Sequence, residues 1–144
     1  MVMNIDKLVF VSKCILLNEK NEFLILKRTN YKNDGTEGLW DIPGGSVDLD
    51  EDVNEAVKRE VSEELQIDLI NPKVFSVDSG KGNPSGQYMF VIFYCRDYDL
   101  KEGIKLSQEH SELKWISVNE MDNYKYYLKD NRIQYIKDFL NSLK

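Results

Sequence analysis

The 144-residue chain contains a single histidine, His110, and only two cysteines. A histidine-dependent catalytic triad would rest on His110 alone, and no nucleophile elbow lies near it. Cys14 and Cys95 stand in β-branched and aromatic runs without the spacing of a metal site. This predicts buried free thiols in a cytoplasmic protein, with a disulfide as the alternative. Any hydrolytic chemistry is therefore expected to use carboxylates.

Long apolar runs and an excess of positive charge are also missing. No stretch approaches the roughly 18 to 20 apolar residues of a membrane span, and the first residues lack the layout of a signal peptide. The 19 Lys and Arg residues are outnumbered by 25 Asp and Glu residues, which gives a formal net charge of −6. This balance argues against long nucleic acids and membranes as partners, but it permits a small anionic substrate if a cation intervenes.

The hydrophobic pattern predicts one domain of mixed α and β structure over residues 1–144. Strands are expected at residues 8–17, 23–26, 40–43, 74–77, 87–95 and 113–118. The first two strands are expected to form a hairpin, and a glycine-rich loop is expected at 79–86. Helices are expected at residues 50–65, 119–127 and 130–144.

The helix expected at 50–65 carries carboxylates on its apolar side. At about 100° per residue, Val57 and Val61 define the buried face, and Glu60 and Glu64 fall within the same arc. Glutamate-rich helices usually have solvated faces, but other polar residues already occupy the outward face here. Two buried carboxylates one turn apart repel each other unless a cation lies between them.

Glu63 adds a third carboxylate at the margin of this face. Glu60, Glu63 and Glu64 have the i, i+3, i+4 spacing that brings side chains together, and their oxygens suit a hard divalent ion. Arg59 alone cannot neutralise all three. Upstream, a Pro-Gly-Gly turn ending at Gly45 would let the backbone approach a ligand or metal closely. The sequence therefore predicts a metal site.

These residues resemble the signature of the Nudix hydrolase family. That signature runs Gly, five residues, Glu, seven residues, then Arg-Glu-aliphatic-x-Glu-Glu-x-Gly-aliphatic. Its positions are filled here by Gly45, Glu51, Arg59, Glu60, Val61, Glu63, Glu64 and Ile67. The one departure is Gln66, where the family has a glycine suited to a left-handed turn after the helix. We expect this departure to cost about 1 kcal/mol of local stability and no chemistry.

The resemblance implies an α+β fold, built as an α/β/α sandwich around a mixed β-sheet, and hydrolysis of a nucleoside diphosphate linked to another group. It implies Mg²⁺, with Mn²⁺ as a substitute, held by the three glutamates Glu60, Glu63 and Glu64 and by the backbone carbonyl of Gly44. Glu60 or Glu63 would orient or deprotonate the attacking water. Arg59 would hold the glutamates by ion pairing, and Glu51 would fix the loop and Arg59.

Many members of the family use one more glutamate from a late loop, and residues 107–115 resemble that loop. Glu109 is the expected metal ligand or base, with Glu112 second. The alternative is that both are solvated loop acids. His110 is expected either to contact substrate or to be an exposed loop residue.

The resemblance also suggests residues that contact the substrate. Lys27 and Arg28 end the second expected strand, similar in place to residues that contact phosphate or base in relatives. Aromatic residues that could stack on a base, or equally pack in the core, are Trp40, Tyr88 and Phe90. Asn131, at the start of the last helix, resembles a base-reading asparagine of the MutT-like branch.

The leading hypothesis is a Mg²⁺-dependent pyrophosphohydrolase that converts a (d)NTP to NMP and pyrophosphate. The close alternative is an ADP-ribose or nucleotide-sugar pyrophosphatase. Two further alternatives are an RNA 5′-end pyrophosphohydrolase, disfavoured by the acidic charge balance, and a non-catalytic nucleotide sensor, disfavoured by the intact glutamate set. The expected partner is a small nucleotide, and the protein is expected to be a monomer or a homodimer.

Overall fold

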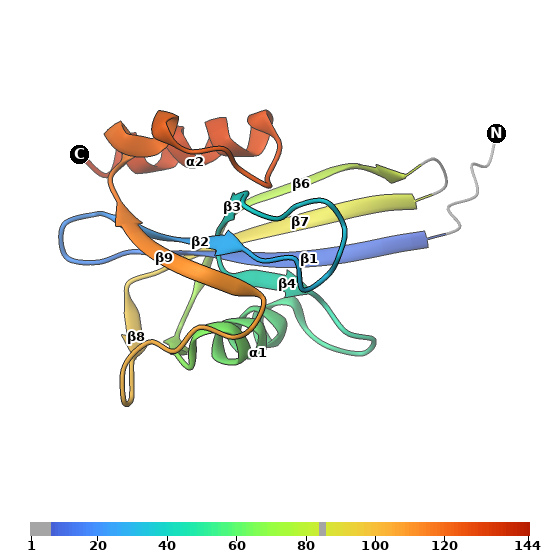
Figure 1. Cartoon of the computed structure of the whole chain (residues 1–144), viewed down its shortest axis with the longest axis horizontal. Coiled ribbons are helices and arrows are strands. Elements are labelled where there is room, and N and C mark those ends of the chain that lie inside the picture. The colour runs from blue at the N-terminus through green and yellow to red at the C-terminus, as the bar shows by residue number, and fades with distance from the viewer. Residues whose placement is uncertain (1–6, 84–85) are drawn as a thin grey trace.

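A computed structural model of the chain describes residues 7–83 and 86–144 (Figure 1). Its strands are β1 (Lys7–Leu16), β2 (Phe23–Arg28), β3 (Trp40–Asp41), β4 (Gly44–Ser46), β5 (Asp68–Ile70), β6 (Lys73–Asn83), β7 (Gly86–Cys95), β8 (Asp97–Asp99) and β9 (His110–Ile116). Its helices are α1 (Val53–Leu65), the 3₁₀ helix η1 (Val118–Asn123) and α2 (Asp130–Ser142).

The described strands form one mixed sheet and two smaller antiparallel sheets. The mixed sheet has the order β4-β1-β7-β6, with β1 parallel to β7 and the other pairs antiparallel. The second sheet has the order β3-β2-β9, and the third pairs β5 with β8. Helices α1 and α2 lie on opposite sides of the strands (Figure 1). This arrangement confirms the α/β/α sandwich around a mixed sheet.

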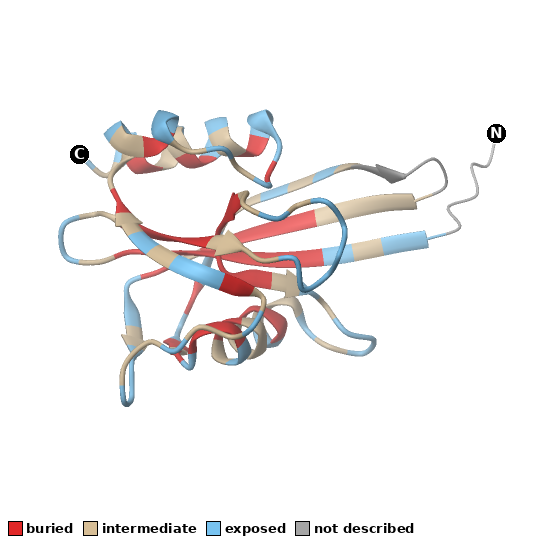
Figure 2. Ribbon diagram, in the orientation of Figure 1, coloured by how far each residue is buried: buried red, intermediate tan, exposed pale blue. Residues whose placement is uncertain are grey.

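Two hydrophobic clusters fill the sandwich, one beneath each helix. Successive side chains of β2 point to opposite faces, so Phe23 and Ile25 join the cluster under α2, whereas Leu24 and Leu26 join the cluster under α1. Strands covered on both faces in this way read as continuous apolar runs. Figure 2 shows the buried residues concentrated where the strands pass between the helices.

The predicted hairpin of the first two strands is wrong. Strands β1 and β2 lie in different sheets, and the isolated antiparallel bridge near their junction joins Phe23 to Leu17, the residue after β1. Instead, β1 pairs along its whole length with the parallel strand β7, and β2 pairs with the late strand β9. Sequence proximity favoured a local pairing, whereas burial on both faces favours the distant partners.

The helix predicted at 119–127 is also shorter than expected. The 3₁₀ helix η1 ends at Asn123, and the following residues pair with Trp40 instead. The Trp40 N–H donates to the Lys125 carbonyl at 2.9 Å, and the Tyr127 N–H donates to the Trp40 carbonyl at 2.8 Å. These backbone bonds compete with the helix and end it.

The glycine-rich loop predicted at 79–86 is largely strand. β6 continues to Asn83 and pairs with β7 over this stretch, while Pro84 and Ser85 lie outside the described residues. The short strands β5 and β8 were not predicted. Cys14 and Cys95 are buried free thiols, as expected. In the described part of the chain, no helix is long and apolar enough to cross a membrane.

Helix α1 has defined caps at both ends. The Asp52 side chain accepts a hydrogen bond from the Asn54 N–H at 2.6 Å, which caps the first turn. After the last turn, Gln66 adopts the left-handed conformation, with φ 57° and ψ 39°, and its N–H donates to the Ser62 carbonyl. The left-handed turn expected at Gln66 is therefore present, and a residue with a side chain occupies it.

Candidate active site

A cavity of about 510 Å³ opens beside α1, the loop before β9 and the strands β1, β2 and β7. Among the predicted site residues, it is lined by Arg28, Gly44, Gly45, Glu60, Glu63, Glu64, Tyr88, Phe90, Glu109 and His110. Other lining residues that the sequence analysis did not single out include Lys13, Tyr31, Lys32 and Tyr127. A cavity of this size is typical of small-molecule sites.

The glycine pair lies where backbone and carboxylates approach closely. A Cβ atom on Gly45 would lie 2.6 Å from the Glu60 carboxyl carbon, and one on Gly44, whose φ is +132°, would lie 2.1 Å from the Ser12 carbonyl oxygen. The Gly44 N–H donates to Glu64 Oε1 at 2.7 Å. The Gly44 carbonyl accepts a hydrogen bond from Lys13 Nζ at 3.3 Å.

Arg59 and Glu51 form the contacts that the resemblance implied. Arg59 donates to both carboxylate oxygens of Glu51, at 2.7 and 3.0 Å, and this pairing lowers the Glu51 pKa to about 2. The same guanidinium reaches Glu60 at 3.0 Å and Glu63 at 3.3 Å. Glu51 also accepts from the Asp48 N–H at 2.9 Å. Arg59 therefore orients the two glutamates, while Glu51 anchors Arg59 to the preceding loop.

Glu64 is a buried carboxylate with few compensating contacts. Its exposed fraction is 4%, and burial raises its pKa to about 8. The largest effect that opposes this shift is the positive charge of Lys13, which is already paired with Asp41 at 2.8 Å. Burial also raises the pKa of Glu60. The sequence prediction that Glu60 and Glu64 face inward agrees with their positions, since Glu64 is buried and Glu60 is half-buried.

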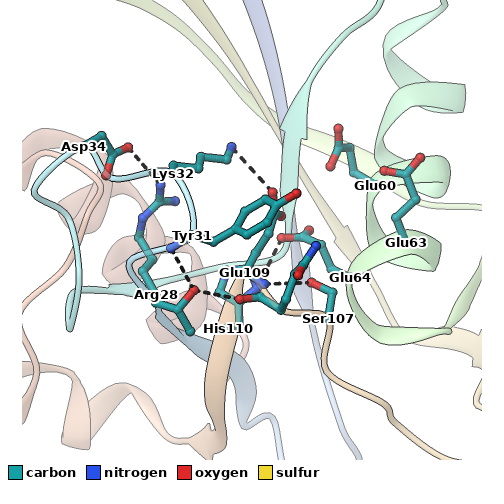
Figure 3. Close-up of polar contacts among 12 residues, drawn as sticks. Arg28, Tyr31, Lys32, Asp34, Glu60, Glu63, Glu64, Ser107, Glu109 and His110 are labelled. Atoms are coloured by element: carbon teal, nitrogen blue, oxygen red, sulfur yellow. Dashed lines mark hydrogen bonds and ion pairs between the residues drawn. The ribbon is translucent and has the colours of Figure 1, made fainter.

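The loop before β9 is attached on two sides, which places Glu109 beside Glu64. On one side, the Ser107 N–H donates to the Glu64 carbonyl at 3.0 Å. On the other, the Thr29 N–H donates to the Glu109 carbonyl at 2.9 Å, and the Thr29 hydroxyl donates to the Gln108 carbonyl at 2.7 Å. Figure 3 shows Glu109 next to Glu64, with Glu60 and Glu63, from the preceding turn of α1, farther away.

A β-bulge turns His110 into the same site. Lys27 pairs with Glu112 but Arg28 pairs with His110, so Ser111 has no partner on β2. Leu113 packs in the cluster under α1, and strict alternation would place Ser111 on that face. The bulge places His110 there instead, with its Nδ1 3.6 Å from Glu64 Oε2. Burial lowers the His110 pKa to about 4, so its imidazole is neutral at physiological pH.

The donor set fits a divalent cation. One ligand atom from each of Glu64, Glu109 and His110 lies within 4.8 Å of the others. His110 Nδ1 is buried and has no hydrogen-bond partner among the described residues. A cation would compensate the carboxylate charge and give this nitrogen a partner. Glu60 and Glu63 line the same cavity, although Arg59 occupies their oxygens.

The opposite side of the cavity carries positive charge. Arg28 stacks on the Tyr127 ring, 4.1 Å from its centroid, and pairs with Asp41 at 3.1 Å. Lys32 lies 3.8 Å from Glu109. Figure 3 shows Arg28 and Lys32 across the site from Glu60 and Glu63. The cavity therefore combines an acidic side that suits a metal with a basic side that suits phosphate groups.

Several predicted substrate contacts lie away from this cavity. Trp40 is buried and packs edge-on against Tyr124 at 5.3 Å. Lys27 lies over the Trp40 ring and pairs with Glu112 at 3.9 Å, on the outer side of β9. Asn131 is exposed at the start of α2. The structure does not bring Lys27, Trp40, Glu112 or Asn131 to the cavity, whereas it brings Arg28 and Tyr88 there.

Comparison with protein families agrees with this geometry. A family model described as the NUDIX domain matches residues 9–139. The chain belongs to the Nudix family. The MutT protein of Methanosarcina mazei Go1 has a solved structure that superposes on this Nudix hydrolase with a TM-score of 0.74 and 27% identity, over 99% of this chain and 95% of that one.

Similar curated proteins place this Nudix hydrolase in the MutT-like branch. A Bacillus subtilis (strain 168) protein, by its name a candidate 8-oxo-dGTP diphosphatase, is 29% identical over 127 residues, covering 88% of this chain and 76% of that protein. The nucleoside triphosphatase NudI of Escherichia coli (strain K12) is 28% identical over 121 residues, covering 77% of this chain and 84% of NudI. The protein is accordingly a hydrolase of phosphoric anhydride bonds.

Proposed function

We propose that this Nudix hydrolase is a Mg²⁺-dependent pyrophosphohydrolase that converts a ribo- or deoxyribonucleoside triphosphate to NMP and pyrophosphate. The observation that carries the proposal is the buried carboxylate Glu64, which faces Glu109 and His110 in a cavity with basic residues on its other side. The names of the NudI and 8-oxo-dGTP diphosphatase relatives support a triphosphate over other linked diphosphates.

The residues proposed to hold the ion are Glu60, Glu63, Glu64 and Glu109, joined by the carbonyl of Gly44. When bound, the divalent ion would neutralise the negative diphosphate oxygens and lower the pKa of a bound water. Mn²⁺ is the expected substitute because it accepts the same oxygen ligands.

Glu60 and Glu63 are proposed to orient the attacking water and accept its proton. Both line the cavity, and Arg59 fixes the directions of their carboxylates. Burial raises the pKa of Glu60 in the direction of neutral pH, and a general base is most effective when its pKa lies near the working pH. Arg59 is a positioning residue in this scheme, because it acts through the glutamates.

The basic and aromatic residues of the cavity are proposed to bind the rest of the nucleotide. Arg28 and Lys32 would contact the phosphates and stabilise the negative charge on the departing pyrophosphate. Tyr88 and Phe90, whose ring centroids lie 6.3 Å apart, line the cavity from β7 and offer an apolar surface for the nucleobase.

A product-resolved screen tests this proposal. Purified protein with Mg²⁺ is offered the eight common (d)NTPs, 8-oxo-dGTP, ADP-ribose, dinucleotides and nucleotide sugars, and the products are separated chromatographically. The expected result is NMP plus pyrophosphate from at least one triphosphate. Preferential release of AMP and ribose 5-phosphate from ADP-ribose would transfer the proposal to the alternative class, and no turnover across the panel would reject both.

A further inference from the structure

We propose that His110 binds the divalent ion directly through Nδ1, so that the metal site has one nitrogen ligand besides its carboxylate oxygens. The inference rests on the proposed function, because it concerns the same ion. The family resemblance implied only oxygen ligands at this site.

Geometry brings the His110 nitrogen to the carboxylates. His110 Nδ1 lies 3.6 Å from Glu64 Oε2, and the ligand atoms of Glu64, Glu109 and His110 all lie within 4.8 Å of one another. Ligands on opposite sides of an ion at about 2.1 Å are separated by roughly 4.2 Å, so small side-chain rotations suffice to close the set.

Burial makes the unpartnered nitrogen informative. The His110 residue has an exposed fraction of 6%, and its Nδ1 has no hydrogen-bond partner among the described residues. A buried polar atom normally has a partner, since leaving it without one costs about 1–3 kcal/mol. At 3.6 Å, the contact with Glu64 is too long for a good hydrogen bond. A metal ion between the two side chains would satisfy both atoms.

The backbone builds this orientation specifically. The β-bulge at Ser111 gives His110 the face that Ser111 would otherwise have, and His110 is thereby directed toward α1. The His110 N–H donates to the Ser107 carbonyl at 3.3 Å, within the loop that also carries Glu109. Bulges commonly re-aim a side chain next to an active site.

A nitrogen ligand changes which ion binds best. Mn²⁺ accepts the same oxygen ligands as Mg²⁺, but as a first-row transition ion it also binds nitrogen ligands, whereas Mg²⁺ strongly prefers oxygen. His110 should therefore raise the affinity for Mn²⁺ relative to Mg²⁺. Replacing His110 with Asn puts an amide oxygen near the position of Nδ1, so His110→Asn should weaken Mn²⁺ binding about tenfold or more and leave Mg²⁺ binding nearly unchanged.

The single histidine permits a direct test by pulsed electron paramagnetic resonance. The chain, free of any histidine tag, is loaded with Mn²⁺ alone, and the spectrum is searched for coupling to a directly bound ¹⁴N nucleus. We expect an imidazole coupling that changes to the ¹⁵N pattern when the protein is made with ¹⁵N-histidine. This isotopic comparison uses the wild-type chain, so it does not depend on the folding of a variant.

Two variants complete the experiment. His110→Asn should lose the nitrogen coupling, whereas Glu112→Gln, which lies on the same strand outside the cavity, should retain it. Bound Mn²⁺ without nitrogen coupling, in an enzyme that turns over nucleotide, would overturn this inference and leave the proposed function intact. Failure of Mn²⁺ and Mg²⁺ to bind at all would overturn both.

Discussion

The two helices of the sandwich each contain 13 residues and each bury one charged side chain, but they compensate that charge differently. On α2, Arg132 is 3% exposed and donates to Asp78 Oδ1 at 2.8 and 2.9 Å, with its guanidinium 3.7 Å from the Phe90 ring centroid. On α1, Glu64 is 4% exposed, and its one ion-pair partner within 4 Å among the described residues is His110, a neutral side chain.

This difference separates a structural charge from a functional one. Burying a charge costs several kcal/mol unless an opposite charge and hydrogen bonds compensate it. The fold itself supplies that compensation to Arg132. It supplies Glu64 with one backbone N–H from Gly44 and with the electrostatic influence of Lys13, a lysine that is already paired with Asp41. The missing compensation on α1 is the strongest indication in the structure that an external cation belongs there.

The largest predicted effect comes from neutralising the charge on α1. Glu64→Gln removes a proposed metal ligand, so turnover should fall on the order of 10³-fold or more. The metal-free melting temperature should stay level or rise, because Gln removes the cost of burying an ionisable group that takes up a proton on folding, while the Gly44 hydrogen bond is kept. Steady-state kinetics and thermal unfolding in EDTA measure the two effects.

Glu55→Gln is the matched control, because Glu55 lies on the exposed face of the same helix and pairs only with Lys58 among the described residues. Its turnover should remain at the wild-type level. A clear fall in the metal-free melting temperature of Glu64→Gln would mean that Glu64, like Arg132, belongs to a structural ion pair.

The opposite pattern is predicted for the charge on α2. Arg132→Met leaves Asp78 without its cation, and the free energy of unfolding should fall by about 3–5 kcal/mol. Metal affinity of the folded protein should not change, since Arg132 does not line the cavity. Chemical denaturation and metal titration measure these quantities. In the double variant Arg132→Met/Asp78→Asn, much of the lost stability should return, and no recovery would argue against the pairing as the cause.

Metal addition should stabilise the protein through α1 alone. A metal at one hundred times its dissociation constant should raise the free energy of unfolding of the wild type by about 2.7 kcal/mol. Arg132→Met should show the same increment, and Glu64→Gln, which is expected to bind at least about tenfold more weakly, should gain no more than about 1.4 kcal/mol at the same metal concentration. Thermal shift with and without Mg²⁺ or Mn²⁺ checks this, and an equal increment in all three proteins would place the ion elsewhere.

The pH dependence of the metal-free protein should also reveal Glu64. Burial raises the Glu64 pKa to about 8, from 4.5 in an exposed chain, so the folded state holds a proton that the unfolded state has lost. Its contribution to stability is therefore present at low pH and is lost as the pH rises toward 8. The neutral His110 acts in the opposite direction only below about pH 6.5.

Between pH 6.5 and 8, unfolding in EDTA should thus show wild-type stability falling relative to Glu64→Gln. Parallel stability curves for the two proteins across this interval would contradict the buried-carboxylate account.

The smallest predicted effect lies at the end of α1. Gln66 adopts φ 57°, a conformation that glycine accepts without a steric penalty. Gln66→Gly should stabilise the protein by up to about 1 kcal/mol and leave turnover unchanged. Gln66→Ala should give no such gain, because alanine keeps the Cβ atom. Urea denaturation of the three proteins measures the difference.

Helical periodicity predicted much of the site because α1 carries its information locally. The inward direction of Glu60 and Glu64 and the left-handed turn at Gln66 follow from residue spacing and from the resemblance. The glycine pair was expected to allow a close approach of the backbone to the site, and at Gly45 the missing Cβ leaves room for the Glu60 carboxylate.

The features of the site that the sequence did not reveal depend on pairing between distant parts of the chain. The position of His110 depends on a bulge against β2, and a bulge at Ser111 has no signal in a single sequence. Tyr127 enters the cavity because its segment pairs with Trp40, which is more than eighty residues away in the chain. The failed β1–β2 hairpin has the same origin, because local turn signals compete with the distant partners of strands buried on both faces.

The most direct test of the central claim is calorimetric titration of Mn²⁺ into metal-free wild type, Glu64→Gln and Arg132→Met under identical conditions. Wild type and Arg132→Met should bind Mn²⁺ with the same affinity, and Glu64→Gln should bind it at least about tenfold more weakly. Equal affinity in Glu64→Gln and wild type would contradict the claim that the uncompensated charge on α1 is a metal ligand.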